Sequence, residues 1–133
     1  MRVLALDYGS ARCGCAISDP TGVLATPLEP VLRPASRHGL RELHNMVGAL
    51  SAERVVVGLP LSLSGGDSHQ TEETRAFARE LRNRLSVPVE LYDERLTTKL
   101  AARTKGRASE DSRAAAHLLE SWLAARERSE EDG

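Results

Sequence analysis

A carboxylate stands at the end of the first apolar run of the sequence, and this feature constrains the fold more than any other. Residues 2–7 are predicted to form a buried strand that ends in Asp7, and the glycine-containing segment 8–14 follows at once. Because Asp is unfavourable in strands, an acid at the end of a central strand calls for an explanation. Either Asp7 accepts hydrogen bonds from the turn that follows, or it anchors a metal or a phosphate on a rigid strand. Taken alone, the segment leaves both explanations open.

Two later strands complete a predicted sheet. Residues 13–18 and 23–32 continue the first strand as an antiparallel meander, and the prolines of the third strand are typical of a sheet edge. The apolar runs 54–58 and 87–92 alternate with helical patterns, which is typical of parallel strands. Three helices are expected: one after an N-cap at Ser36, one that ends before Pro88, and a last one with Ala115, Leu118, Leu119, Trp122 and Leu123 on its apolar stripe. The order βββαβαβα predicts an α/β fold, a mixed five-stranded sheet with helices on its faces.

Composition limits the domain organisation and the class of protein. A chain of 133 residues fits one domain, which we expect over residues 1–126, followed by an acidic and disordered tail over residues 127–133. Aromatic residues make up only 3% of the chain, which argues against a base-stacking platform for single strands. Cys13 and Cys15 are too few for a zinc site, and we expect both to be buried and reduced. With no signal-peptide or membrane-spanning pattern, we expect a cytoplasmic protein without membrane contact.

Further acids fall where other predicted elements begin or end. Asp93 and Glu94 close the fifth strand, and Asp111 lies in the first turn of the last helix. Function in open α/β sheets gathers at the carboxyl ends of the parallel strands, so Asp7, Glu94 and Asp111 are candidates for one site. Carboxylates clustered without His or Cys favour Mg²⁺ or Mn²⁺, and two such ions can cleave a phosphodiester bond.

Each of these acids also has a plain structural explanation. Asp111 could stabilise a helix N-terminus, and Asp93 and Glu94 could be turn residues or partners of Arg95. We favour the metal site because the acids converge on one predicted edge of the sheet.

Basic and hydroxyl side chains adjoin the acids. Between Arg95 and Arg107 the chain has five basic residues and no acidic one. We expect this segment to contact nucleic-acid phosphates, although a solvated cationic helix face with threonine caps is the alternative. The candidate contacts are Arg95, Thr97, Thr98, Lys99, Lys105 and Arg107.

With these motifs in view, the chain resembles the YqgF/RuvX family, whose members are named as pre-16S rRNA nucleases related to Holliday junction resolvases. The likeness is carried by residues 7–19, 57–65, 93–98 and 111–119. It implies an RNase H-like fold, a catalytic and metal-binding trio of Asp7, Glu94 and Asp111 that holds Mg²⁺ or Mn²⁺ as a two-ion site, and a nucleic-acid contact at Arg12. The segment between Thr98 and Asp111 is shorter than is usual in the family.

The leading functional hypothesis is therefore a metal-dependent endonuclease, a phosphodiester hydrolase that acts on structured RNA in the 5′ maturation of pre-16S rRNA. Resolution of four-way DNA junctions is a second nuclease hypothesis. A nucleic-acid-binding assembly factor that does not cleave is an alternative of another class. The Asp-x-Gly opening also resembles the phosphate loops of actin-like ATPases, but these need two lobes and 133 residues supply one. The sequence allows a homodimer without demanding one.

Overall fold

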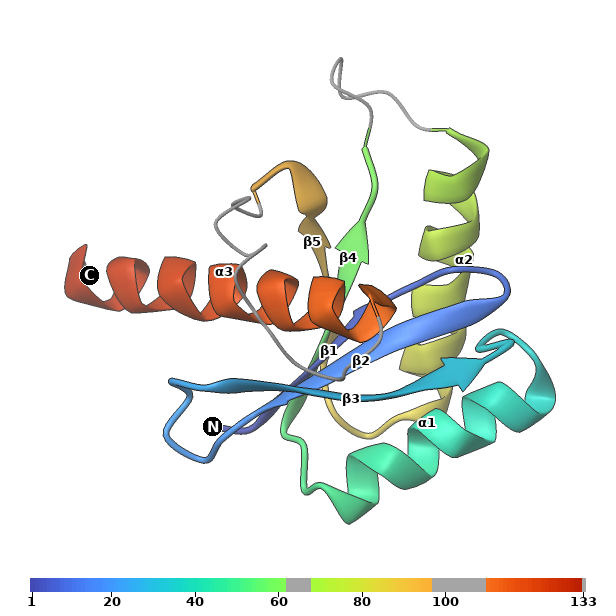
Figure 1. The fold of residues 1–133 in the computed structure, drawn as a ribbon, viewed down its shortest axis with the longest axis horizontal. Helices are drawn as coiled ribbons and strands as arrows, with labels where there is room; N and C mark the ends of the chain where they lie inside the picture. Colours follow the sequence, from blue (N-terminus) through green and yellow to red (C-terminus); the bar gives the residue numbers. More distant parts are fainter. Residues whose placement is uncertain (62–67, 97–109, 133) are drawn as a thin grey trace.

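The computed structural model describes residues 1–61, 68–96 and 110–132 (Figure 1). The elements in chain order are β1 (Val3–Asp7), β2 (Arg12–Ser18), β3 (Ala25–Leu32), α1 (Arg37–Ala49), β4 (Arg54–Leu59), α2 (His69–Arg84), β5 (Val89–Asp93), the single 3-10 turn η1 (Glu94–Leu96) and α3 (Glu110–Asp132). This order agrees with the one expected from the sequence.

The five strands form one mixed sheet in the order β3-β2-β1-β4-β5. β2 runs antiparallel to both β1 and β3, whereas β4 runs parallel to both β1 and β5. The predicted α/β architecture is confirmed. β1 is the central strand, so Asp7 ends a strand that has two further strands on each side of it. β3 is an edge strand, which accommodates Pro27 and Pro30 because an edge leaves some backbone groups unpaired.

Helices cover both faces of the sheet (Figure 1). α1 and α2 pack on one face, where Leu4 and Leu6 of β1 meet Leu43 and Phe77 in one buried cluster. α3 packs on the other face against Val3, Ala5, Ala16 and Val56. Because side chains alternate along a strand, Asp7 continues the Val3–Ala5 series and lies on the α3 face. The fold therefore presents Asp7 to the helix that carries Asp111.

Small side chains bring α3 close to the sheet. Ala5 and Ala16 on the strands and Ala115 and Ala116 on the helix are all fully buried in the contact between them. Trp122, expected in the core from periodicity, is 7% exposed and closes the far end of this contact. A helix seated this closely has its first turn near the sheet backbone.

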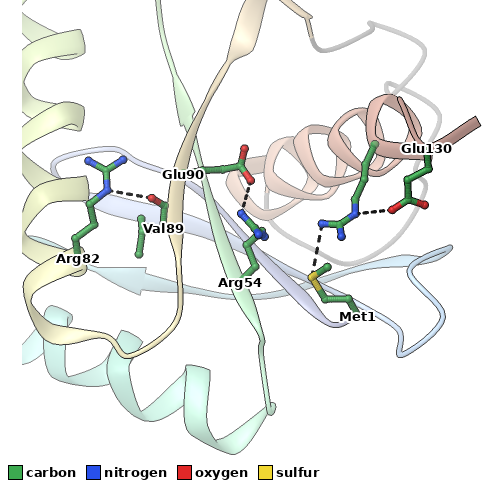
Figure 2. A network of polar contacts seen from close by, with 7 residues as sticks. Met1, Arg54, Arg82, Val89, Glu90 and Glu130 are labelled. Carbon is green, nitrogen blue, oxygen red and sulfur yellow. Dashed lines mark hydrogen bonds and ion pairs between the residues drawn. The ribbon is translucent and has the colours of Figure 1, made fainter. Parts of the chain in front are cut away.

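Polar contacts fasten the short edge strand β5. Figure 2 shows Arg54 of β4 donating to the Glu90 carboxylate at 2.9 Å. Arg82 of α2 donates to the backbone carbonyl of Val89 at 3.0 Å. Together these contacts tie β5 to a neighbouring strand and to a helix on the opposite face from α3.

The acidic end of the chain differs from expectation. Residues 127–132 continue α3, where the sequence led us to expect a disordered tail, and Gly133 lies outside the described residues. The reason is a set of contacts one turn apart. The Arg126 guanidinium lies 5.4 Å from the Trp122 ring centroid and 3.2 Å from a Glu130 carboxylate oxygen, so the helix remains supported beyond residue 126.

The predicted cap of α1 and the burial of both cysteines are confirmed. The Ser36 hydroxyl accepts from the Gly39 backbone N–H at 3.0 Å, as an N-cap should. Cys13 and Cys15 are buried free thiols. None of the described helices is long and apolar enough to cross a membrane.

Truncation of Leu119 tests how much the α3 contact stabilises the fold. Leu119 is fully buried, so we expect Leu119→Ala to lower the free energy of unfolding by about 2–5 kcal/mol. Leu32 is 64% exposed, and Leu32→Ala should change it by less than about 0.5 kcal/mol. Urea denaturation of both variants provides the measurement, and equal losses would mean that α3 is not packed as described.

Candidate active site

Glycines flank Asp7 in both neighbouring strands. Asp7 lies opposite Gly14 of β2, and Gly58 of β4 comes one step beyond the pair formed by Leu6 and Val57. A Cβ atom on Gly14 would overlap the backbone carbonyl of Asp111, and one on Gly58 would lie 2.7 Å from the Glu94 Oε1 atom. The missing side chains therefore let two other acids approach Asp7 from two sides.

Glu94 reaches Asp7 across the strand that separates them. β4 lies between β1 and β5, and the Glu94 side chain passes over Gly58 to place its carboxyl against that of Asp7. Burial, and then the hydrogen bond to Asp7, raise the pKa of Glu94 to about 7. Burial also raises the pKa of Asp7, partly offset by the same hydrogen bond. The protonated Glu94 carboxyl thus donates to the Asp7 carboxylate.

Asp111 joins this pair from the first turn of α3. Its negative charge raises the pKa of Asp7 further, which places it within electrostatic reach. The Arg12 guanidinium lies 3.9 Å from the Asp111 carboxylate, and both side chains are partly exposed. Such an exposed pair contributes little stability, so Asp111 can exchange this partner for another cation. The structure thus brings Asp7 and Glu94 into contact and sets Asp111 within electrostatic reach of Asp7, with Arg12 beside Asp111.

Ser112, which the sequence analysis did not single out, fixes the first turn of α3. Its side chain is fully buried, and its hydroxyl accepts from the Cys15 backbone N–H at 3.3 Å. This contact falls where β2 changes register with β3, between Cys13 and Cys15. The available signal in the sequence was a serine three residues before Ala115, within the stripe that packs on the sheet.

Asp93 is an ion-pair partner of Arg95, which was the structural alternative considered for it in the sequence analysis. Its carboxylate receives the Arg95 guanidinium, with the closest contact at 2.7 Å, and this hydrogen bond lowers the pKa of Asp93. Arg95, a candidate phosphate contact, is therefore engaged locally in this structure. The other candidate contacts in this segment, Thr97, Thr98, Lys99, Lys105 and Arg107, lie outside the described residues.

The donors at this site are of the kind that a hard divalent cation prefers. Asp7, Glu94 and Asp111 offer only carboxylate oxygens, which suits Mg²⁺ or Mn²⁺. In the part of the chain that is described, no three His, Cys, Asp or Glu side chains already stand together as a metal-binding group. The Asp7–Glu94 contact agrees with this preference, because two carboxylates this close need either a shared proton or a cation between them. The residues therefore fit a divalent ion.

Comparison with known proteins identifies the family of this chain. A family model described as "RuvX: Holliday junction resolvase" matches residues 1–125. A protein of Mycobacteroides abscessus is 40% identical over 99% of this chain and 86% of its own length, and one of Maridesulfovibrio salexigens is 37% identical over 93% and 98%. A third, from Koribacter versatilis, is 44% identical over 73% of this chain and 63% of its own length. All three carry the name "Putative pre-16S rRNA nuclease".

Among solved structures, Thermus thermophilus RuvC in complex with a Holliday junction substrate superposes with a TM-score of 0.65 over 96% of both chains. The sequence identity is 14%, so this likeness shows the fold alone. The expected RNase H-like fold is confirmed.

The shared proton predicts how stability depends on pH in the metal-free protein. The folded-state pKa of Glu94, about 7, lies above its ordinary value of 4.5, so the folded protein holds the proton more tightly than the unfolded chain does. This contribution is fully present below pH 4.5 and is lost as the pH rises to about 7. Glu94→Gln keeps a donor to Asp7 without a titrating proton, so its free energy of unfolding should fall less over this window.

Denaturant unfolding between pH 4 and pH 8 in a chelator measures this difference. Glu127→Gln, on the exposed part of α3, is the matched control and should follow the wild-type profile. Identical profiles for Glu94→Gln and wild type would contradict the shared proton.

Proposed function

Since this chain belongs to the RuvX (Holliday junction resolvase) family, we propose that it is a metal-dependent endonuclease that cleaves structured RNA in the 5′ maturation of pre-16S rRNA. The observation that carries the proposal is the contact between the Asp7 and Glu94 carboxyls at the carboxyl ends of β1 and β5, with Asp111 beside them. Holding carboxylates close together costs free energy because they repel each other. A metal-dependent nuclease needs such a cluster to bind its ions.

The metal requirement follows from the fold and from these acids. Nucleases with an RNase H-like fold generally depend on divalent metals, and we infer that Asp7, Glu94 and Asp111 hold Mg²⁺ or Mn²⁺ in a two-ion site. When bound, such ions activate water and stabilise the leaving oxygen of a phosphodiester.

The protein's own side chains must rearrange little for this chemistry. Glu94 gives up the proton that it donates to Asp7, and Asp111 turns away from Arg12. Arg12, half-exposed beside the acids, is then available to a phosphate oxygen of the substrate. The basic segment from Lys99 to Arg107 would extend this contact along the backbone.

The choice of RNA rests on the relatives, which are named for pre-16S rRNA. A second candidate is cleavage of four-way DNA junctions, which the description of the family favours. In either case we place the activity in the cytoplasm. If the protein binds structured RNA without cleaving it, an assembly factor would replace both nuclease candidates.

Neutralising Asp7 separates catalysis from folding. Asp7→Asn keeps the shape of the side chain but removes a charge from the acidic cluster, so we expect cleavage to fall by at least about 100-fold. Above pH 7, where Glu94 has lost its proton, the melting temperature should stay the same or rise, because the repulsion of Asp7 by Glu94 and Asp111 is relieved. Unfolding of Asp7→Asn would show instead that Asp7 acts as a structural cap.

The assay compares a pre-16S rRNA fragment with a four-way DNA junction under Mg²⁺, Mn²⁺ and chelator. Cleavage of the RNA by wild type with either ion, and by neither Asp7→Asn nor the chelated enzyme, is the expected result. Cleavage of the junction alone would favour the second candidate. Tight RNA binding without cleavage under every condition would contradict the nuclease proposal.

The basic segment is expected to hold the phosphate backbone. Lys105→Gln combined with Arg107→Gln should weaken RNA binding similarly for all sequences, because phosphate contacts position the substrate without specifying it. The slope of log affinity against log salt should become shallower by about one unit per lost contact. Filter binding from low to high salt measures both effects.

A matched double variant serves as the control. Arg37→Gln with Arg41→Gln removes the same charge from the exposed side of α1, on the sheet face opposite α3. This control should keep the wild-type affinity and salt slope. If the two double variants behave alike, the backbone is held elsewhere.

A further inference from the structure

The turn that carries Glu94 is fastened to α3 by a polar contact. η1 follows β5 directly, and the Ser121 hydroxyl of α3 donates to the backbone carbonyl of Leu96, the last residue of η1, at 2.9 Å. The Leu96 side chain is 58% exposed, so burial of this side chain does little to hold the turn in place. The hydroxyl of Ser121 therefore supplies a directional contact at a point two residues from the Glu94 carboxyl.

A second hydroxyl completes the arrangement. The Tyr92 hydroxyl lies 3.3 Å from the Ser121 oxygen, and either atom could be the donor on geometry alone. A carbonyl can only accept, so the single proton of Ser121 is committed to Leu96. Tyr92 must then donate to Ser121. The contacts form a directed chain from the Tyr92 hydroxyl to the Ser121 hydroxyl to the Leu96 carbonyl.

This series of hydrogen bonds begins at Tyr92 and ends at Leu96, on either side of Glu94 in the sequence. Tyr92 is the partner of Gly58 in the β4–β5 pairing, and its side chain packs against the cluster beneath α3. Leu96 is the last residue of η1. The residues two positions before and two positions after Glu94 therefore both contact Ser121 of α3. The same helix carries Asp111 in its first turn. Two of the three acids are thereby positioned by one rigid element.

We propose that Ser121, held by Tyr92, is the positioning residue that sets the Glu94 carboxyl against Asp7. The inference rests on the proposed metal-dependent function for its catalytic consequence, but not for its structural one. Ser121 contacts Tyr92 and the Leu96 carbonyl, and it acts on Glu94 through the backbone of η1. A ligand-bearing turn that loses such support binds metal less well because its carboxylate samples more positions.

The experiment compares Ser121→Ala, Ser121→Thr and wild type in three measurements. In Ser121→Ala, the Mn²⁺ concentration for the half-maximal rise in melting temperature should increase by about tenfold, the usual effect of removing a group that orients a metal ligand. Amide hydrogen exchange in the peptide that spans residues 93–96 should become faster. kcat for cleavage should fall by about tenfold with KM nearly unchanged, since substrate grip lies elsewhere.

Two variants make the result specific to the hydroxyl. Ser121→Thr keeps a hydroxyl that can donate to Leu96, so it should restore the Mn²⁺ response, the exchange rate and kcat. Ser129→Ala removes an exposed hydroxyl two turns further along α3 and should match wild type in all three measurements. Tyr92→Phe should give an intermediate loss, because Ser121 can still donate after its own donor is removed.

The outcomes separate this inference from the proposed function. Wild-type exchange at residues 93–96 together with a wild-type Mn²⁺ response in Ser121→Ala would overturn the positioning role. A loss in Ser121→Thr as large as that in Ser121→Ala would also overturn it. If wild type cleaves neither nucleic acid, the proposed function fails, yet faster exchange in Ser121→Ala with rescue by Ser121→Thr would still establish the positioning of η1.

Discussion

Glu94 can reach Asp7 only because the strand between them has no side chain at Gly58. The two acids end or follow strands that are not neighbours, and any Cβ on the intervening residue would stand 2.7 Å from the Glu94 carboxyl oxygen and 3.1 Å from the Leu118 side chain. Gly14 does the same for Asp111 on the other side of Asp7. The rest of the site depends on these two glycines, since the Glu94 side chain and the backbone of the first turn of α3 approach Asp7 only where the sheet has no side chain.

Much of this arrangement could be predicted from the sequence. The order of strands and helices along the chain and the burial of Trp122 follow from periods of 2 and 3.6 residues, which indicate the face that each side chain takes. The approach of Glu94 to Asp7 follows from a topological rule, because parallel strands deliver their carboxyl ends to one edge. The metal-binding role of these acids and of Asp111 stays a prediction. Gly58 and Gly14 were visible only as motif positions, and their steric role became clear from the Glu94 side chain over Gly58 and the Asp111 backbone over Gly14.

What could not be predicted involves partners chosen by tertiary contact. Asp93 and Glu94 are adjacent acids, yet one pairs with Arg95 at the surface and the other points inward to Asp7. Ser112 and Ser121 each take a backbone partner far away in sequence, in Cys15 and Leu96. No periodicity encodes such choices. The helical residues beyond 126 were missed for a related reason. Their acidic composition predicted disorder, whereas the contacts of Arg126 with Trp122 and Glu130 support the helix there.

The helix α3 both carries Asp111 in its first turn and packs on the sheet further along its length. Near its start, the helix carries Asp111, and the buried Ser112 hydroxyl accepts from the backbone of β2. Further along, Ala115, Ala116 and Leu119 are completely buried, and Trp122 lies with guanidinium groups of Arg54 and Arg126 at 6.0 and 5.4 Å from its ring. Repulsion among the acids pushes the first turn away from the sheet, and the apolar contact opposes that push without adding any charge. Because this stability lies one to three turns away from Asp111, the proposed exchange of a proton or of Arg12 for a metal ion would leave the helix that carries Asp111 in place.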